Sequence, residues 1–206
     1  MPNFLTHLAV AKRYAQKNNI TGQDARDFYD GNVHPDLGVL HNNNLTKEQR
    51  HYNKKPPSTL AHENYCKDRV DFAEFLAKNK VETHFERGIL MHLIVDNYCY
   101  REVLDMEKFF NLVYSTGIDA RWVLKCTFNS KHDYLIEKYA IDYNITGRKE
   151  IIEQSLERWE KDAVQCTAVY DLLDTEEKLE KLDAFIERIS SLNLDDFIAS
   201  YLDNNK

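Results

Sequence analysis

The chain has 206 residues, of which 43% are hydrophobic and 12% aromatic, which is enough for a buried core and too many for a disordered chain. It has only 6 glycines and 4 prolines, which argues against a turn-rich β-sandwich or barrel and favours long helices. The net charge is −7. Residues 1–100 carry 13 Lys and Arg against 12 Asp and Glu, and residues 101–206 carry 14 Lys and Arg against 22 Asp and Glu. Because the chain is acidic, we expect no general nucleic-acid surface.

The sequence also bears on the compartment in which the protein works. No apolar run approaches the ~18 residues of a membrane-spanning helix, so no transmembrane segment is expected. The N-terminal stretch turns basic after a short apolar run, unlike a signal peptide, which favours a cytoplasmic location. The cysteines form no C-x-x-C pair, and in such a compartment all of them are expected to be reduced and mostly buried. They are Cys66, Cys99, Cys126 and Cys166.

Apolar residues recur at helical spacing along most of the chain, which predicts a single all-α domain, residues 1–206, of about seven to nine helices. The first two helices are expected over about 3–18 and about 24–30. Residues 31–57 follow as an irregular stretch with at most one helical turn, from Thr46 to His51. A loop of this length in a compact domain is usually either functional or disordered. This one is rich in histidine and carries Asp36, which favours a functional loop.

The next helix is expected from Ser58, which can cap it, to about Lys78. Thr83 and Glu86 form a capping-box pair that predicts another helix over about 84–104. The helix expected over about 84–104 is apolar nearly all round, so it should be the buried, central helix of the fold.

The remainder of the chain, 105–206, is acidic and reads as further helices forming a solvated outer layer. Their expected ranges are about 105–114, 119–126, 131–143, 148–173, 176–189 and 195–202. An apolar stripe within residues 176–192 could pack on the chain's own core or on a second copy, so a homo-oligomer is left open.

Histidine is concentrated in the first half of the chain, because seven of the eight histidines lie between His7 and His92. The sharpest local feature is His92-Leu-Ile-Val-Asp96, in which the two polar residues share one face of the central helix. A buried carboxylate is costly unless it is paired or bound to a cation. The pair could therefore bind a metal ion, or it could form a buried hydrogen bond that joins helices.

Three residues elsewhere complete a candidate ligand set in residues 1–104. His7 lies near the apolar face of the first helix, Asp36 follows the stiffening Pro35 on the long loop, and His51 lies further along that loop. Three imidazoles and two carboxylates suit Zn²⁺ or a similar divalent ion. The predicted metal ligands are His7, Asp36, His51, His92 and Asp96.

Four segments, taken in their order along the chain, resemble the zinc-dependent phospholipase C family. They are THLAVA at 6–11, GNVHPD at 31–36, HY at 51–52 and HLIVD at 92–96. The family has an all-helical fold that it shares with a class of nucleases. The resemblance covers about the first 100 residues, and its weight comes from the ordered set of segments.

By position, the resemblance implies that Asp36, His51, His92 and Asp96 hold one metal ion. It implies that Asp96 also bridges to a second ion, which His7 and the N-terminal amine would hold. That amine would belong to Met1 or, after removal of Met1, to Pro2.

The sequence departs from the family where further ligands are expected. The family has another histidine after the HxxxD aspartate, where this chain has Tyr98 and Tyr100, and a later histidine–glutamate pair for a third ion, which His132 does not supply. We therefore predict a site for one or two metal ions and not for three. Some residues could join or replace the ligands: His34, His41, His62, His84, His132 and Asp133.

A site for one or two divalent ions, most simply Zn²⁺, is therefore expected. A bound divalent ion lowers the pKa of a water molecule toward ~7 and so makes hydroxide available at neutral pH. We accordingly expect a metal-dependent hydrolase that acts on a phosphodiester or phosphomonoester, with a small phosphate ester or a phospholipid as substrate. Asp36 or Asp96 could act as a catalytic base as well as a ligand.

Two other interpretations stay open at the level of sequence. One is an HD-type phosphohydrolase, an all-helical enzyme class marked by an adjacent His-Asp pair, which His132 and Asp133 would supply. The other is a non-catalytic helical module, for metal binding or protein interaction, that retains a degenerate site.

Overall fold

The computed structural model describes residues 3–37, 46–54, 68–163, 166 and 170–203. Within these ranges the chain is all-helical, as predicted, and the number of helices slightly exceeds the seven to nine expected. The helices are α1 (Phe4–Lys17), α2 (Gly22–Leu37), α3 (Lys47–Arg50), α5 (Phe72–Lys78), α6 (His84–Val103), α7 (Met106–Thr116), α8 (Ala120–Asn129), α9 (His132–Tyr139), the 3₁₀ turn η2 (Tyr143–Ile145), α10 (Lys149–Ala163), α11 (Glu176–Ile189) and α12 (Leu194–Asp203).

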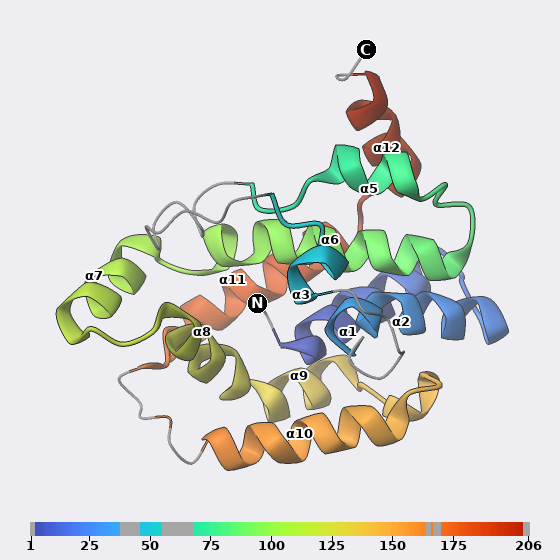
Figure 1. Cartoon of the computed structure of the whole chain (residues 1–206). Helices are drawn as coiled ribbons and strands as arrows, with labels where there is room; N and C mark the ends of the chain where they lie inside the picture. The colour runs from blue at the N-terminus through green and yellow to red at the C-terminus, as the bar shows by residue number, and fades with distance from the viewer. Residues whose placement is uncertain (1–2, 38–45, 55–67, 164–165, 167–169, 204–206) are drawn as a thin grey trace.

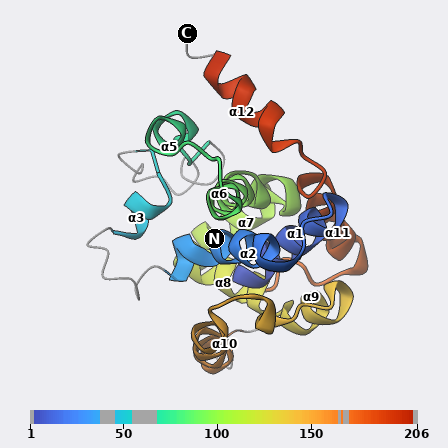
Figure 2. The same ribbon diagram turned by 90° about the vertical axis from the view of Figure 1, so that its right-hand side faces the viewer.

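Helix α6 crosses the middle of the molecule, with α1, α2 and α11 packed around it (Figure 1). Helices α8, α9 and α10 lie on one side of this central group, and α5 and α12 lie on the other side. Helix α12 packs on α5 and projects away from the body of the molecule (Figure 2). Among the described residues, no helix is long and apolar enough to cross a membrane.

The central helix is the one that the sequence predicts. The Thr83 hydroxyl accepts a hydrogen bond from the Glu86 amide, and the Glu86 carboxylate accepts one from the Thr83 amide, which is the predicted capping box. From Leu90 to Asn97 every residue of α6 is buried. A side chain on any face of this stretch is therefore held by protein packing.

Two glycines let α2 and α6 cross with their backbones in close contact. A Cβ atom on Gly31 would lie 1.9 Å from the Phe85 carbonyl oxygen, and one on Gly88 would lie 2.2 Å from the Phe28 carbonyl oxygen. Neither position can hold a larger residue unless the helices separate. The crossing brings the C-terminal half of α2 against the buried part of α6.

The expected end of the second helix at Gly31 is wrong, because α2 continues to Leu37 through Gly31 and Pro35. Gly31 serves the helix crossing instead of ending the helix. Pro35 leaves one carbonyl of the helix without its usual amide partner, a cost that the packing of α2 on α6 offsets. Asp36 consequently lies on a helix and not on an irregular loop. The single turn predicted near Thr46 is confirmed as α3.

The helix expected over 58–78 is also shorter than predicted. Residues 68–71 are not helical, and α5 begins only at Phe72, where the Asp71 carboxylate accepts a hydrogen bond from the Glu74 amide. Residues 58–67 lie outside the described ranges. Val70 forms an isolated antiparallel bridge with Asn53, which competes with helix formation at this point.

Two helices of the second half differ from their expected ranges as well. Helix α9 ends at Tyr139, because Ala140 takes a left-handed conformation with φ of 46°. Helix α10 ends at Ala163, and residues 171–173 do not continue it. The Thr127 hydroxyl on α8 donates to the Tyr170 carbonyl and accepts from the Leu172 amide, so it holds this segment in a non-helical path.

The cysteines are not all reduced, contrary to expectation. Cys126 on α8 and Cys166 form a disulfide, with their Cα atoms 5.4 Å apart. The contacts that Thr127 makes with the neighbouring segment bring that part of the chain against α8. Cys99 is a free, buried thiol, as expected, and Cys66 lies outside the described residues.

Candidate metal centre

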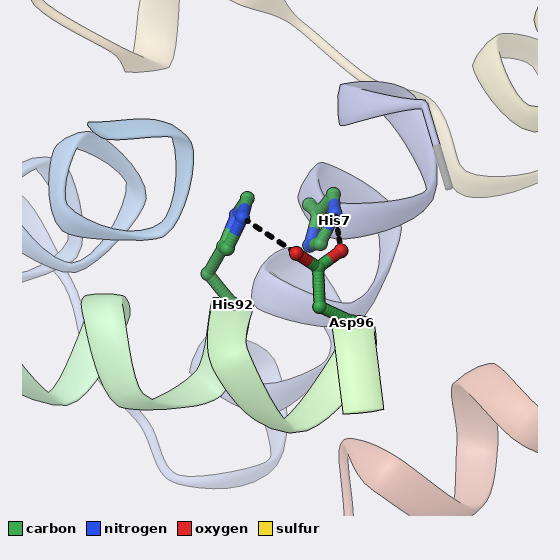
Figure 3. Close-up of side chains that lie close together, drawn as sticks. All are labelled: His7, His92 and Asp96. Carbon is green, nitrogen blue, oxygen red and sulfur yellow. Dashed lines mark ion pairs between the residues drawn. The ribbon is translucent and has the colours of Figure 1, made fainter. Parts of the chain in front are cut away.

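Two central helices supply the core of the site. His92 and Asp96 lie one turn apart on α6, and His7 faces them from α1 (Figure 3). His7 Nε2 lies 3.4 Å from Asp96 Oδ1, and His92 Nε2 lies 3.6 Å from Asp96 Oδ2. The rings of His7 and His92 are stacked, with centroids 3.8 Å apart. The predicted convergence of His92 and Asp96 on one helix face is confirmed.

Helix α2 and the single turn α3 add the remaining two residues. Asp36 lies in the last turn of α2, and His51 is the C-terminal cap of α3. His51 Nε2 lies 3.4 Å from Asp36 Oδ1 and 3.6 Å from Asp96 Oδ2. All five side chains predicted as ligands therefore come together, although they are separated by up to 89 positions in the chain.

Backbone carbonyls orient two of the imidazoles. His92 Nδ1 lies 2.7 Å from the carbonyl oxygen of Asn32, and His51 Nδ1 lies 2.7 Å from that of Lys47. A ring that donates from Nδ1 keeps its Nε2 lone pair free, which is the arrangement found in metal-binding histidines. Both Nε2 atoms point at the carboxylates.

The polar atoms that face one another in this cluster are buried and lack hydrogen bonds. They are Nε2 of His7, His51 and His92 and Oδ1 of Asp96. The three imidazoles are fully buried, and the Asp96 and Asp36 side chains are only 7% and 13% exposed. Buried polar atoms are nearly always satisfied, so these four require a partner that none of the described residues supplies.

The spacing of these atoms distinguishes the two interpretations of the His92–Asp96 pair. Nitrogen–oxygen separations of 3.4–3.6 Å exceed the length of about 2.9 Å typical of a hydrogen bond. Atoms arranged tetrahedrally around a zinc ion, each about 2.1 Å from it, lie about 3.4 Å apart. The cluster thus fits a bound ion better than a hydrogen-bonded pair.

The two oxygens of Asp96 divide the cluster into two groups. Asp36, His51 and His92 form one group, in which the ligand atoms all lie within 4.8 Å of one another and are of the kinds that Zn²⁺ binds. Asp96 Oδ2 borders this group, 3.6 Å from the Nε2 atoms of both His51 and His92. Oδ1 faces His7 in the second group. His92 Nε2 lies within reach of either group, but a single lone pair can serve only one ion. Residues 1–2, and with them the predicted N-terminal ligand, lie outside the described residues.

Burial and mutual contacts set the charge states in the cluster. Burial lowers the pKa of His7 to about 4, and the neighbouring His92 acts in the same direction. Burial opposes ionisation of Asp96, but His92 and His7 outweigh it and hold the pKa of Asp96 well below its usual range. Burial also opposes protonation of His92, but the Asp96 carboxylate outweighs it and raises the pKa of His92. A neutral His7 and an ionised Asp96 are the forms that bind a metal.

Other residues that could have joined the site lie elsewhere. The His34 ring packs against the Phe85 ring, with centroids 5.2 Å apart. His84 Nε2 lies 3.7 Å from Asp24 Oδ2. His132 and Asp133 begin α9 and belong to no group of potential ligands among the described residues. His41 and His62 lie outside those residues.

Lys47 is a neighbour of the site that the sequence reasoning missed. Its ammonium nitrogen lies 3.7 Å from Asp36 Oδ1, and its side chain is half-exposed. Lys47 precedes His51 by four residues, a spacing that places both on one side of a helical turn. That spacing is the signal that could have identified it.

Comparison with known proteins adds no relative. No family model matches the chain, and neither the curated proteins nor the solved structures include a match. The functional argument therefore depends on the site.

Proposed function

We propose that this protein is a metal-dependent phosphoesterase with a site for one or two divalent ions, similar to that of the zinc-dependent phospholipase C family. The observation that carries the proposal is the convergence of three imidazole nitrogens and three carboxylate oxygens at separations of 3.4–3.6 Å. Four of these atoms are buried without a hydrogen bond. The order of the ligands in the chain is the order in that family.

In this proposal Asp36, His51, His92 and Asp96 hold one ion, and His7 and Asp96 contribute to a second. An ion bound by these residues would supply Lewis-acid chemistry, that is, water activation and charge neutralisation at a phosphate group. The carbonyls of Asn32 and Lys47 orient His92 and His51 so that their Nε2 atoms face the carboxylates. Asp36 is the more exposed of the two carboxylates, so it is the better placed to accept a proton from solvent or substrate.

A second candidate function is a non-catalytic metal site that stabilises the fold. The near-complete burial of the five side chains favours it, because structural metal sites are closed whereas catalytic sites keep an open position. Both candidate functions require a bound metal ion, but only the phosphoesterase turns over a substrate.

Hydrolysis of bis(p-nitrophenyl) phosphate and of a phosphatidylcholine vesicle by zinc-loaded protein separates the two candidates. We expect turnover that a chelator abolishes and added zinc restores. Asp36→Asn should lower the rate by at least about a hundredfold, since it removes a ligand and the most exposed carboxylate. Asp133→Asn, at an exposed carboxylate outside the site, should leave it unchanged. Bound zinc without turnover on a broad panel of phosphate esters would instead support the structural role.

A further inference from the structure

His51 reaches the site from a short segment that no long helix holds in place. Helix α3 is a single turn, and after His51 the chain runs antiparallel to residues 68–71. The Lys54 amide donates a hydrogen bond of 2.8 Å to the Arg69 carbonyl. Residues 51–54 together with 68–71 are called the His51 strap below. The position of His51 depends on what fixes this strap to the core.

Two residues of α6 bond the strap: Arg101, which donates to Asp68 Oδ1 at 2.7 Å, and Asn97, the neighbour of Asp96, which reaches the strap backbone. Its Oδ1 accepts hydrogen bonds from the amides of Arg69 at 2.8 Å and Val70 at 3.2 Å. Its Nδ2 donates to Asp68 Oδ1 at 3.1 Å. Asn97 is buried, and its bond to the Val70 amide is buried with it. These bonds join the strap directly to α6, the helix that carries His92 and Asp96.

The backbone immediately after His51 is strained. Tyr52 has a φ of 48°, a left-handed conformation that a bulky residue adopts only when its surroundings impose it. Its carbonyl accepts from the Asp71 amide at 2.7 Å, its hydroxyl accepts from Asn79 Nδ2 at 3.0 Å, and its ring packs on Phe75. The strap therefore holds His51 in a conformation that an isolated turn would not keep.

We infer that Asn97 is a positioning residue for the metal centre, which acts by fixing the strap so that His51 Nε2 meets Asp36 and Asp96. Asn97 forms these hydrogen bonds with the strap and not with the side chain of a predicted ligand. Its effect on the metal centre is therefore indirect. The inference rests on the proposed metal site. It adds a residue that determines whether the group of Asp36, His51 and His92 is formed in advance of metal binding.

The test is the zinc affinity of Asn97→Ala, measured by competition with a chromogenic chelator. The variant leaves the amides of Arg69 and Val70 without their acceptor, so the strap loosens. Loss of an outer residue that orients a ligand typically costs about 10- to 100-fold in metal affinity, and we expect a loss in this range. His51→Ala, which removes the ligand itself, should lose at least as much.

Thr127→Val is the matched control. The Thr127 hydroxyl also fastens a segment to a helix, by bonds to Tyr170 and Leu172, but that segment carries none of the five ligands. We expect Thr127→Val to lower the free energy of unfolding and to keep the wild-type zinc affinity. Equal losses of zinc affinity in Asn97→Ala and Thr127→Val would overturn the inference, and so would an unchanged affinity in Asn97→Ala.

A measurement on the wild-type protein keeps the inference testable if Asn97→Ala does not fold. Zinc should slow hydrogen exchange at the amides of Arg69 and Val70, because binding at His51 stabilises the strap and its bonds to Asn97. Zinc bound without any change at these amides would overturn the inference and leave the metal site intact. A wild-type protein that binds no zinc would instead overturn the proposed function.

Discussion

Asp96 gives the candidate centre its geometry at the scale of single residues. Its two oxygens face different imidazoles, so one side chain can serve two groups of ligands. Replacing Asp96 removes a member of the His7–His92–Asp96 group and also the oxygen that lies beside His51, whereas replacing His7 leaves the Asp36–His51–His92 group complete. Each ligand thus has a distinct expected effect on the number of ions bound.

Lys47 is expected to weaken metal binding, because its charge lies 3.7 Å from Asp36 Oδ1. Lys47→Gln removes a positive charge that competes with the ion for this carboxylate. The side chain is half-exposed, so solvent screens the effect, and we expect zinc affinity to rise by up to about fivefold. Chelator competition measures the change, with Lys80→Gln, at an exposed lysine, as the control. A lower zinc affinity in Lys47→Gln would contradict this expectation.

The five clustered side chains could be singled out from the sequence because they are chemically distinctive. Histidine and aspartate at a four-residue spacing on an apolar helix are costly to bury without a function, and this marks His92 and Asp96. Asn97 contacts the backbone amides of Arg69 and Val70, and Lys47 places a surface charge beside Asp36. Residues of these types are common in every chain, so only the three-dimensional contacts distinguish them.

The crossing of α2 and α6 controls the site at the scale of secondary structure. It places Asn32 beside His92 and brings Asp36 to the ligands on α6. The sequence places α6 correctly because its cap and apolar character are local signals. It ends α2 too early, because a glycine that breaks a helix and a glycine that permits close packing look the same without the partner helix.

Gly31→Ala is expected to separate the two helices, since its Cβ atom would lie 1.9 Å from the Phe85 carbonyl oxygen. Overpacking of this kind against a backbone should lower the free energy of unfolding by about 3 kcal/mol or prevent folding. Gly147→Ala is the control, because its Cβ atom would meet only the movable Asp30 side chain, at 3.1 Å. Urea denaturation compares the variants. A Gly31→Ala protein within about 1 kcal/mol of wild type would show that the helices can separate at little cost.

The disulfide constrains the chain at the scale of the whole molecule. Cys126 and Cys166 are 40 residues apart, and the bond closes the stretch that contains α9 and α10. The sequence does not predict it, because two cysteines without a C-x-x-C spacing reveal their proximity only in the folded chain.

Reduction of this bond should destabilise the protein by about 4 kcal/mol, because a closed loop of this length restricts the unfolded chain. Thermal unfolding with and without dithiothreitol measures the effect in the wild type. Cys166→Ser should unfold at a lower temperature and should not respond to the reductant. Cys99→Ala, which lacks the free buried thiol, should respond as the wild type does. A wild-type melting temperature that dithiothreitol leaves unchanged would contradict the prediction.

The metal content of the purified, untagged protein tests the central claim most directly. Elemental mass spectrometry of the wild type should find one to two equivalents of zinc or a similar divalent metal. The double variant His92→Ala, Asp96→Ala should contain none. His84→Ala, which removes a histidine of the same helix outside the cluster, should retain the wild-type content. A wild type that contains no metal and takes up neither Zn²⁺ nor Mn²⁺, or a double variant that retains its metal, would contradict the account.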